Sequence, residues 1–229
     1  MKLRVLLPIV FVIAGCGGGG NSTPINALNG QFRQLQAGDS CTYTFSGVYT
    51  PTGGTATSVS GKAVHTVISR SGTTITINHV VTTSIYGQTT TQTSSIVETQ
   101  NADGSTAEVS DDAGANGATR TVATDTFPLI GVIKVGQMTS GKITFTDGEW
   151  STGTSTVTGT ALISTPIGAV NTFVVQSQGD NNAGYASTTT ANSIPQLGFS
   201  AGWTENDDLP KIGQETVTFT IQSTNIPGF

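Results

Sequence analysis

Apolar and polar residues alternate along most of the chain from Ser40 onward. In Cys41–Ser46 apolar residues alternate with hydroxyl residues, and a period of two is typical of a strand with one buried face. The sequence Pro51-Thr52-Gly53-Gly54 then predicts a turn. The earlier range Ile25–Leu35 lacks this alternation and predicts either a short helix or an irregular lead-in.

A β-hairpin is predicted from Lys62–Arg70 and Thr73–Thr83, which flank Ser71-Gly72 as a two-residue turn. The register that this turn sets gives the hairpin one mostly apolar face. The facing pairs in that register are Ile68 with Ile75, Thr66 with Ile77, and Val64 with His79. The side chains of His65 and His79 are therefore expected to point to opposite faces.

Further stretches along the chain have the length and composition of strands. They are Thr89–Thr99, Thr106–Ser110, Arg120–Thr126, Lys142–Thr146, Ser155–Ser164, Asn171–Gln178, Tyr185–Thr190 and Glu215–Ser223. Turn-forming residues separate them, as in Asp111–Gly117 and Asn206–Pro210. Short strands at this spacing, without an amphipathic helix, predict an all-β protein, either an antiparallel β-sandwich or an open curved barrel.

A weak internal similarity recurs in the two halves of the chain. Leu35–Asp39 is similar to Ile133–Gln137, and Thr44–Gly47 is similar to Thr144–Gly148. Because the matches occur in the same order in both halves, they favour two similar β lobes, at about 32–126 and 127–229. Accidental similarity within a Thr-rich chain is the alternative.

The N-terminus has the pattern of a secretory signal. Lys2 and Arg4 precede an apolar run, Val5–Ala14, which is too short to span a bilayer of about 30 Å. The four residues Ile13-Ala14-Gly15-Cys16 resemble a lipobox, the motif at which bacterial lipoprotein signal peptidase cleaves before a lipid-modified cysteine. An ordinary secretory signal with an incidental cysteine is the alternative.

The lipobox resemblance implies a bacterial envelope lipoprotein. It implies a signal peptide at 1–15, a lipidated Cys16 with a Gly-rich tether at 16–24, and a β-rich extracytoplasmic domain at 25–229. The membrane partner would be reached through diacylglyceryl and acyl groups such as palmitate, because several chains anchor durably and one does so only marginally. Since Gly17 follows the cysteine in place of Asp, the resemblance favours the outer over the inner membrane if the host is Gram-negative.

Two stretches of the body also resemble a loose class of uncharacterised bacterial envelope lipoproteins. Leu35–Tyr43 is similar to an opening strand of the form Gly-Asp/Asn-x-Trp-x-Tyr, although Cys41 stands in place of Trp. Thr165–Val170 is similar to a Thr-Pro-Ala-Gly-x-Phe hairpin. This resemblance implies a β-rich fold and an envelope location, with no activity attached.

Composition narrows the class of protein further. With 10% charged residues, a formal net charge of −5 and a pI near 4.8, the chain lacks the basic surface of a nucleic-acid binder. Good helix formers are scarce, whereas Thr, Val, Ile and Gly are abundant, so long helices are not expected. The glycines at 17–20 have neither the preceding strand nor the following Lys-Ser/Thr of a phosphate-binding loop, and no cofactor is predicted.

Candidate catalytic residues are few. Gly198–Gly202 matches the nucleophile-elbow pattern around Ser200, but both histidines precede Ser200, whereas that fold places its His after its Ser. We therefore expect a Gly-rich loop and no catalytic residue, with an envelope hydrolase using Ser200 as an unfavoured alternative. Cys41 is the remaining cysteine once Cys16 is lipidated, and we expect it to be a buried free thiol.

Metal-binding signals are also weak. Glu205, Asp207 and Asp208 are weak Ca²⁺ candidates, but they lack EF-hand spacing, and Asp and Asn are common in turns. Two histidines without a third ligand make a poor zinc site, so no metal is predicted. Trp150 and Trp203 are expected to lie beside turns.

These observations give one leading hypothesis and, besides the unfavoured hydrolase, one alternative. The leading hypothesis is a non-enzymatic, lipid-anchored envelope protein whose β domain has a structural or binding role. The alternative is a carrier that binds an apolar ligand in the cavity of a curved sheet. A deep apolar cavity would favour the carrier, whereas a filled core would exclude it.

Overall fold

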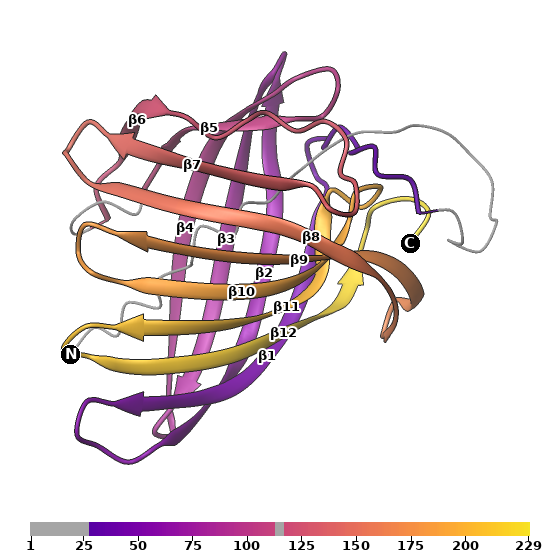
Figure 1. The fold of residues 1–229 in the computed structure, drawn as a ribbon. Helices are drawn as coiled ribbons and strands as arrows, with labels where there is room; N and C mark the ends of the chain where they lie inside the picture. Colours follow the sequence, from indigo (N-terminus) through magenta and orange to yellow (C-terminus); the bar gives the residue numbers. More distant parts are fainter. Residues whose placement is uncertain (1–27, 113–116) are drawn as a thin grey trace.

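The computed structural model describes residues 28–112 and 117–229. In these residues twelve strands form one closed antiparallel barrel, in which each strand pairs with its chain neighbours and β1 pairs with β12 (Figure 1). The strands are β1 (Ser40–Pro51), β2 (Thr57–Ser71), β3 (Thr74–Ile85), β4 (Gln88–Gln100), β5 (Thr106–Asp111), β6 (Arg120–Asp125), β7 (Met138–Phe145), β8 (Trp150–Thr165), β9 (Gly168–Asn181), β10 (Ala186–Ile194), β11 (Phe199–Leu209) and β12 (Gly213–Thr224).

The all-β prediction is confirmed, and the barrel replaces the sandwich. The sheet has no free edge, because β1 pairs with β2 on one side and with β12 on the other. The lead-in from residue 28 to residue 39 is irregular and not helical. Within the described ranges, no helix is long and apolar enough to cross a membrane. The expected signal peptide, Cys16 and the tether lie outside the described residues.

The strand predictions omitted β11. This strand includes most of Gly198–Gly202, which was expected to be a loop, and most of Asn206–Pro210, which was expected to be a turn. Its neighbours β10 and β12 supply the backbone partners on both sides, so strand pairing overrides the turn preference of Gly, Asn and Asp. Gly202 suits this place, because a Cβ there would lie 2.5 Å from the carbonyl oxygen of Phe219.

The β2–β3 hairpin turns at Gly72-Thr73, one residue later than predicted. Ser71 pairs with Thr74, and Gly72 has a φ of 60°. Residues at such turn positions need a positive φ, which glycine adopts without strain. The Ser71-Gly72 turn prediction is therefore wrong by one residue.

A β-bulge between Val67 and Ser69 changes the pairing along the rest of this hairpin. Beyond the bulge Val67 faces Ile77 and His65 faces His79. The predicted opposite orientation of the two histidines is wrong, because one extra residue exchanges the inner and outer faces of a strand. The bulged residue Ile68, which was expected to face Ile75, is 55% exposed.

One end of the barrel is filled by the lead-in. Leu35 and Phe32 are fully buried there, together with Leu197 and Ile226 from later in the chain. The backbone N–H of Leu35 donates to Oε1 of Gln100 (2.9 Å), and the Arg70 guanidinium donates to the same oxygen and to the Leu35 carbonyl (both 2.7 Å). We call this lead-in, residues 28–39, the plug. These bonds satisfy backbone groups that the plug buries.

The two segments that resemble each other in sequence also share a local geometry. In each half the turn before a long hairpin exchanges two backbone hydrogen bonds with a valine, and a β-bulge follows that valine. The bonds are Gly38 N to Val67 O, Val67 N to Asp39 O, Gly136 N to Val157 O and Val157 N to Gln137 O, at 2.7 to 2.9 Å. Both halves contribute strands to one barrel, and duplication of the chain stays a prediction.

Replacing Gln100 with Leu is expected to destabilise the barrel. The substitution removes the acceptor for the Leu35 N–H and for Arg70 within a fully buried site, and an unpaired buried donor costs about 1–3 kcal/mol. Urea unfolding of the two chains measures this loss. The control is Gln88→Leu, the same substitution at an exposed position of the same strand. Equal stability of the two variants would contradict the role given to Gln100.

Candidate functional site

The barrel encloses a cavity of about 180 Å³. Eight strands leave an interior that side chains just fill, so a twelve-stranded barrel is wider than its own side chains can pack. The plug takes up one end, and the cavity lies among inward side chains of β1–β8, β11 and β12 and of the β6–β7 loop. Its apolar lining is Tyr43, Ala63, Ile77, Val81, Ile96, Ala107, Phe127, Pro128, Ile130, Ile143, Phe199, Trp203 and Phe219.

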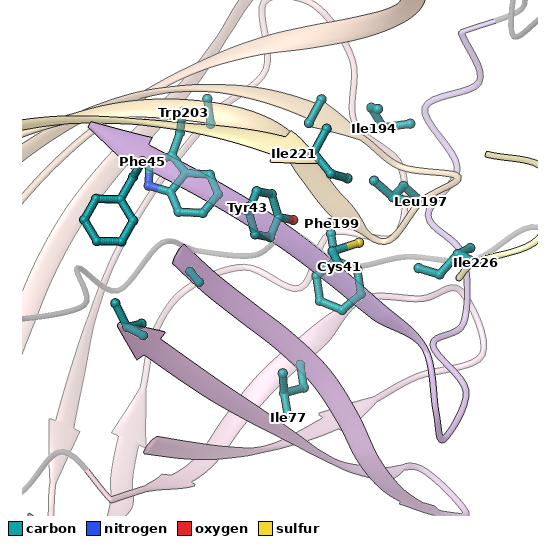
Figure 2. Close-up of a cluster of buried hydrophobic side chains, with 14 of the residues drawn as sticks. Cys41, Tyr43, Phe45, Ile77, Ile194, Leu197, Phe199, Trp203, Ile221 and Ile226 are labelled. Carbon is teal, nitrogen blue, oxygen red and sulfur yellow. The ribbon is translucent and has the colours of Figure 1, made fainter. Parts of the chain in front are cut away.

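Aromatic side chains from β1, β11 and β12 form one wall of this cavity. Trp203 stacks on Phe219 with ring centroids 4.3 Å apart and meets Tyr43 edge-on at 5.0 Å. In Figure 2 the indole of Trp203 lies between the rings of Phe45 and Tyr43, which come from β1. The expectation that Trp203 lies beside a turn is wrong, because Trp203 lies within β11 and its side chain faces the lumen.

A pair of histidines adjoins the aromatic wall. The rings of His65 and His79 lie 4.2 Å apart, and the His65 ring lies 5.1 Å from that of Tyr43. Burial lowers the pKa of His79 to about 4 and that of His65 well below its usual value, so both rings are neutral near pH 7. His79 is 4% exposed, and neither of its ring nitrogens has a hydrogen-bond partner among the described residues.

A pair of acidic residues lies further along the same inner face. Glu98 of β4 is directly opposite Glu108 of β5. Oε2 of Glu98 and Oε1 of Glu108 are buried and have no hydrogen-bond partner in the described part of the chain. Burial raises the pKa of Glu98 to about 7. Burial and the nearby carboxylate of Asp111 raise that of Glu108 to about 8.

Arg120 lines the cavity beside this acidic pair, but its charge is already balanced. Its guanidinium donates to both oxygens of Asp111 (2.6 and 2.8 Å) and to Oε2 of Glu149 (2.6 Å). It also lies over the Phe145 ring, 3.8 Å from the centroid. Since two carboxylates occupy its donors, Arg120 is poorly placed to bind an anionic ligand.

Ser200 lies near the start of a paired strand and not at a nucleophile elbow. It belongs to β11 and faces Ser193 of β10, and a strand, not a helix, follows it. The expected Gly-rich loop at this position is therefore wrong as well. Ser200 and both histidines line the cavity, yet His79 makes no hydrogen bond that would orient it as a base.

The acidic residues of β11 lie on two faces of the strand. Glu205 is buried and accepts a hydrogen bond from Nε1 of Trp203 (3.2 Å), and Asp207 follows it on the same face. Asp208 is exposed and points to the opposite face, because side chains alternate along a strand. In residues 28–112 and 117–229, no group of three or more His, Cys, Asp or Glu side chains is placed to hold a metal ion.

Cys41 and Trp150 were the two other candidates named from the sequence, and both pack against neighbouring side chains. Cys41 is a buried free thiol, as expected, and its Sγ lies 3.4 Å from Oγ1 of Thr224. Burial raises the pKa of this thiol to about 11, so it is unreactive near neutral pH. Trp150 packs under the ammonium group of Lys142, which lies 4.3 Å from the ring centroid.

Sequence reasoning missed Glu98, Glu108 and Arg120. The stretches Thr89–Thr99 and Thr106–Ser110 were predicted as strands, and alternation within them would have placed Glu98 and Glu108 on one face or the other. The sequence has no signal for which face is inside, because Thr and Ser occupy both faces of β4. Only closure of the barrel decides it.

Comparison with known proteins identifies no family. No family model matches the chain, and no curated protein matches it. Among solved structures, it is similar to a proposed exported protein with a YmcC-like fold from Bacteroides fragilis. That likeness has 11% sequence identity and a TM-score of 0.42, and it covers 86% of this chain and 99% of the other.

The two histidines are expected to stay neutral well below their usual pKa of about 6.5. A lowered pKa in the folded state contributes stability that is complete above pH 6.5 and is lost as the pH falls toward 4. Because the chain has two histidines, their Cε1 proton signals report directly on His65 and His79. An NMR titration should show no midpoint between pH 5.5 and 7.5, and a midpoint near 6.5 would contradict the burial of the pair.

Proposed function

We propose that this protein is a lipid-anchored envelope protein whose barrel carries a small apolar molecule in its lumen. One observation carries the proposal, namely the cavity of about 180 Å³ inside a closed barrel with a largely apolar and aromatic lining. Ligand sites are typically concave, mostly apolar and provided with a few polar groups, and this cavity has that character. A filled core would have supported a purely structural role.

The shape of the aromatic wall supports binding in preference to simple packing. Trp203, Phe219 and Tyr43 contact one another and still present part of their surfaces to the cavity. Rings held in place by their neighbours lose little conformational entropy when a ligand arrives, so they form a preorganised surface. An apolar cavity of about 150 Å³ is known to bind a molecule as small as benzene.

The anchor is the second part of the proposal, and its support is the lipobox pattern around Cys16. A Gly-rich tether between Cys16 and the barrel would let the barrel reach ligands near a membrane surface. Sparingly soluble molecules concentrate at such a surface, so an anchor and an apolar lumen suit the same task.

Replacing Cys16 with Ser is expected to release the protein from the membrane. The expected result is loss of an incorporated alkyne-palmitate label and transfer of the protein to the soluble fraction, because the variant has no thiol at position 16 for lipid attachment. The matched control is Cys41→Ala, which removes the other cysteine and should keep both label and membrane association. A membrane-bound, unlabelled wild type would contradict the anchor.

Toluene is expected to bind in the lumen, and Ala63→Leu is expected to weaken that binding by about tenfold or more. Ala63 lines the cavity, so a larger side chain there occupies the space that the ligand needs. Isothermal titration calorimetry measures the affinity, and amide shifts locate the site. Ala186→Leu is the control, since Ala186 is exposed on β10. Failure of the wild type to bind toluene would contradict the proposed function.

A further inference from the structure

The polar atoms of the cavity indicate what kind of apolar molecule it takes. Most buried polar atoms in folded proteins have a hydrogen-bond partner, and each exception requires an explanation. Four unpartnered buried atoms of the described residues belong to three side chains that line this cavity. They are Nδ1 and Nε2 of His79, Oε2 of Glu98 and Oε1 of Glu108.

The charge of the lining is strongly one-sided. In the described part of the chain the lining includes six acidic side chains and one basic one. The hydrogen bonds of the Arg120 guanidinium go to Asp111 and Glu149 and not to the Glu98–Glu108 pair. The acidic residues are Glu98, Glu108, Asp111, Asp112, Asp125 and Glu205.

The two free carboxyl oxygens belong to directly opposite residues. Such cross-strand neighbours have Cβ atoms about 5 Å apart, so one small donor group can contact both side chains. Apolar residues Ile77 and Ile96 follow on the same inner face. His79 lies four residues along β3, about 13 Å, from Ile75, the residue that pairs with Glu98. The cavity thus has an acidic end and an aromatic end, with aliphatic side chains between them.

We propose, on the basis of the proposed carrier function, that the ligand is a small apolar molecule with one protonated primary amine, held between Glu98 and Glu108. The ammonium group has three N–H donors, and the two unpartnered carboxyl oxygens accept two of them. The apolar body of the ligand lies over Ile77 and Ile96 toward the aromatic wall. An anionic ligand would instead approach a lining that holds six acidic side chains.

Because Glu98 and Glu108 are protonated in the empty barrel, the proposed binding should release protons. Glu98 faces Glu108 and Thr106, and Glu108 faces Asp111, Glu98 and Arg120. With pKa values of about 7 and 8, the two carboxyl groups hold protons near pH 6.5 in the empty barrel. An ammonium ion favours their charged forms, so its binding releases protons to the buffer.

The test compares 2-phenylethylamine with 2-phenylethanol, a neutral molecule of nearly the same shape. By calorimetry at pH 7.5 the amine should bind the full chain about tenfold more tightly than the alcohol. At pH 6.5 the heat of amine binding should vary with the ionisation enthalpy of the buffer, because protons are released, whereas the heat for the alcohol should not. Equal affinities, or an amine heat that does not depend on the buffer, would overturn the inference.

Substitutions of Glu98 and Glu108 test whether these two residues cause the preference for the amine over the alcohol. Glu98→Gln with Glu108→Gln should reduce the preference for the amine over the alcohol to about twofold or less. The matched control is Glu215→Gln, because Glu215 is also buried with a raised pKa, about 7, but does not line the cavity. If the double variant does not fold, each single variant is measured in the same way. A preference that survives these substitutions would refute the role of the pair.

The outcome also separates this inference from the proposed function. If toluene and 2-phenylethanol bind and the amine has no advantage, the carrier function stands and the amine preference is wrong. If none of the three probes binds in the lumen, both proposals are wrong.

Discussion

The antiparallel pairing of β1 with β12 closes the sheet and sets the width of everything inside it. A closed sheet of twelve strands has no exposed edge, but its interior is wider than a single layer of side chains fills. The lead-in with Leu35 fills one end, where Gln100 and Arg70 satisfy its backbone. The cavity is what remains between this plug and the aromatic wall. Closure therefore accounts both for the stability of the fold and for the cavity on which the proposed carrier function rests.

The selectivity proposed for the lumen depends on buried polar groups that cost stability. Glu98, Glu108 and His79 each bury an atom without a partner, and unpaired buried polar groups destabilise a fold. The fold limits this cost by keeping the groups neutral, since burial raises the carboxyl pKa values and lowers the histidine pKa values. A ligand that supplies donors to the carboxyl pair recovers part of that cost on binding. A purely apolar molecule such as toluene would occupy the cavity without this gain, so the same groups would favour the amine over it.

Local alternation predicted most strands, since Thr89–Thr99 and Glu215–Ser223 lie within β4 and β12. It failed where tertiary pairing outweighed local preference, as in β11, whose Gly and Asp residues resemble turns. It failed again at the Ile68 bulge, because one inserted residue reverses the inner and outer faces and brings His65 against His79. The position of Glu98 and Glu108 inside the barrel could not be predicted for a related reason. Thr and Ser suit either face of a strand, so only barrel closure identifies the inside.

The central claim is that the lumen holds an accessible apolar cavity beside Trp203 and Phe219. The proposed carrier role and the proposed amine preference both require this cavity. Diffraction from crystals of the protein pressurised with xenon tests it most directly, because xenon enters dry apolar cavities. The account predicts an anomalous peak inside the barrel, between the aromatic wall and Ile77. Xenon peaks confined to the outer surface, with the lumen filled by side chains, would contradict it.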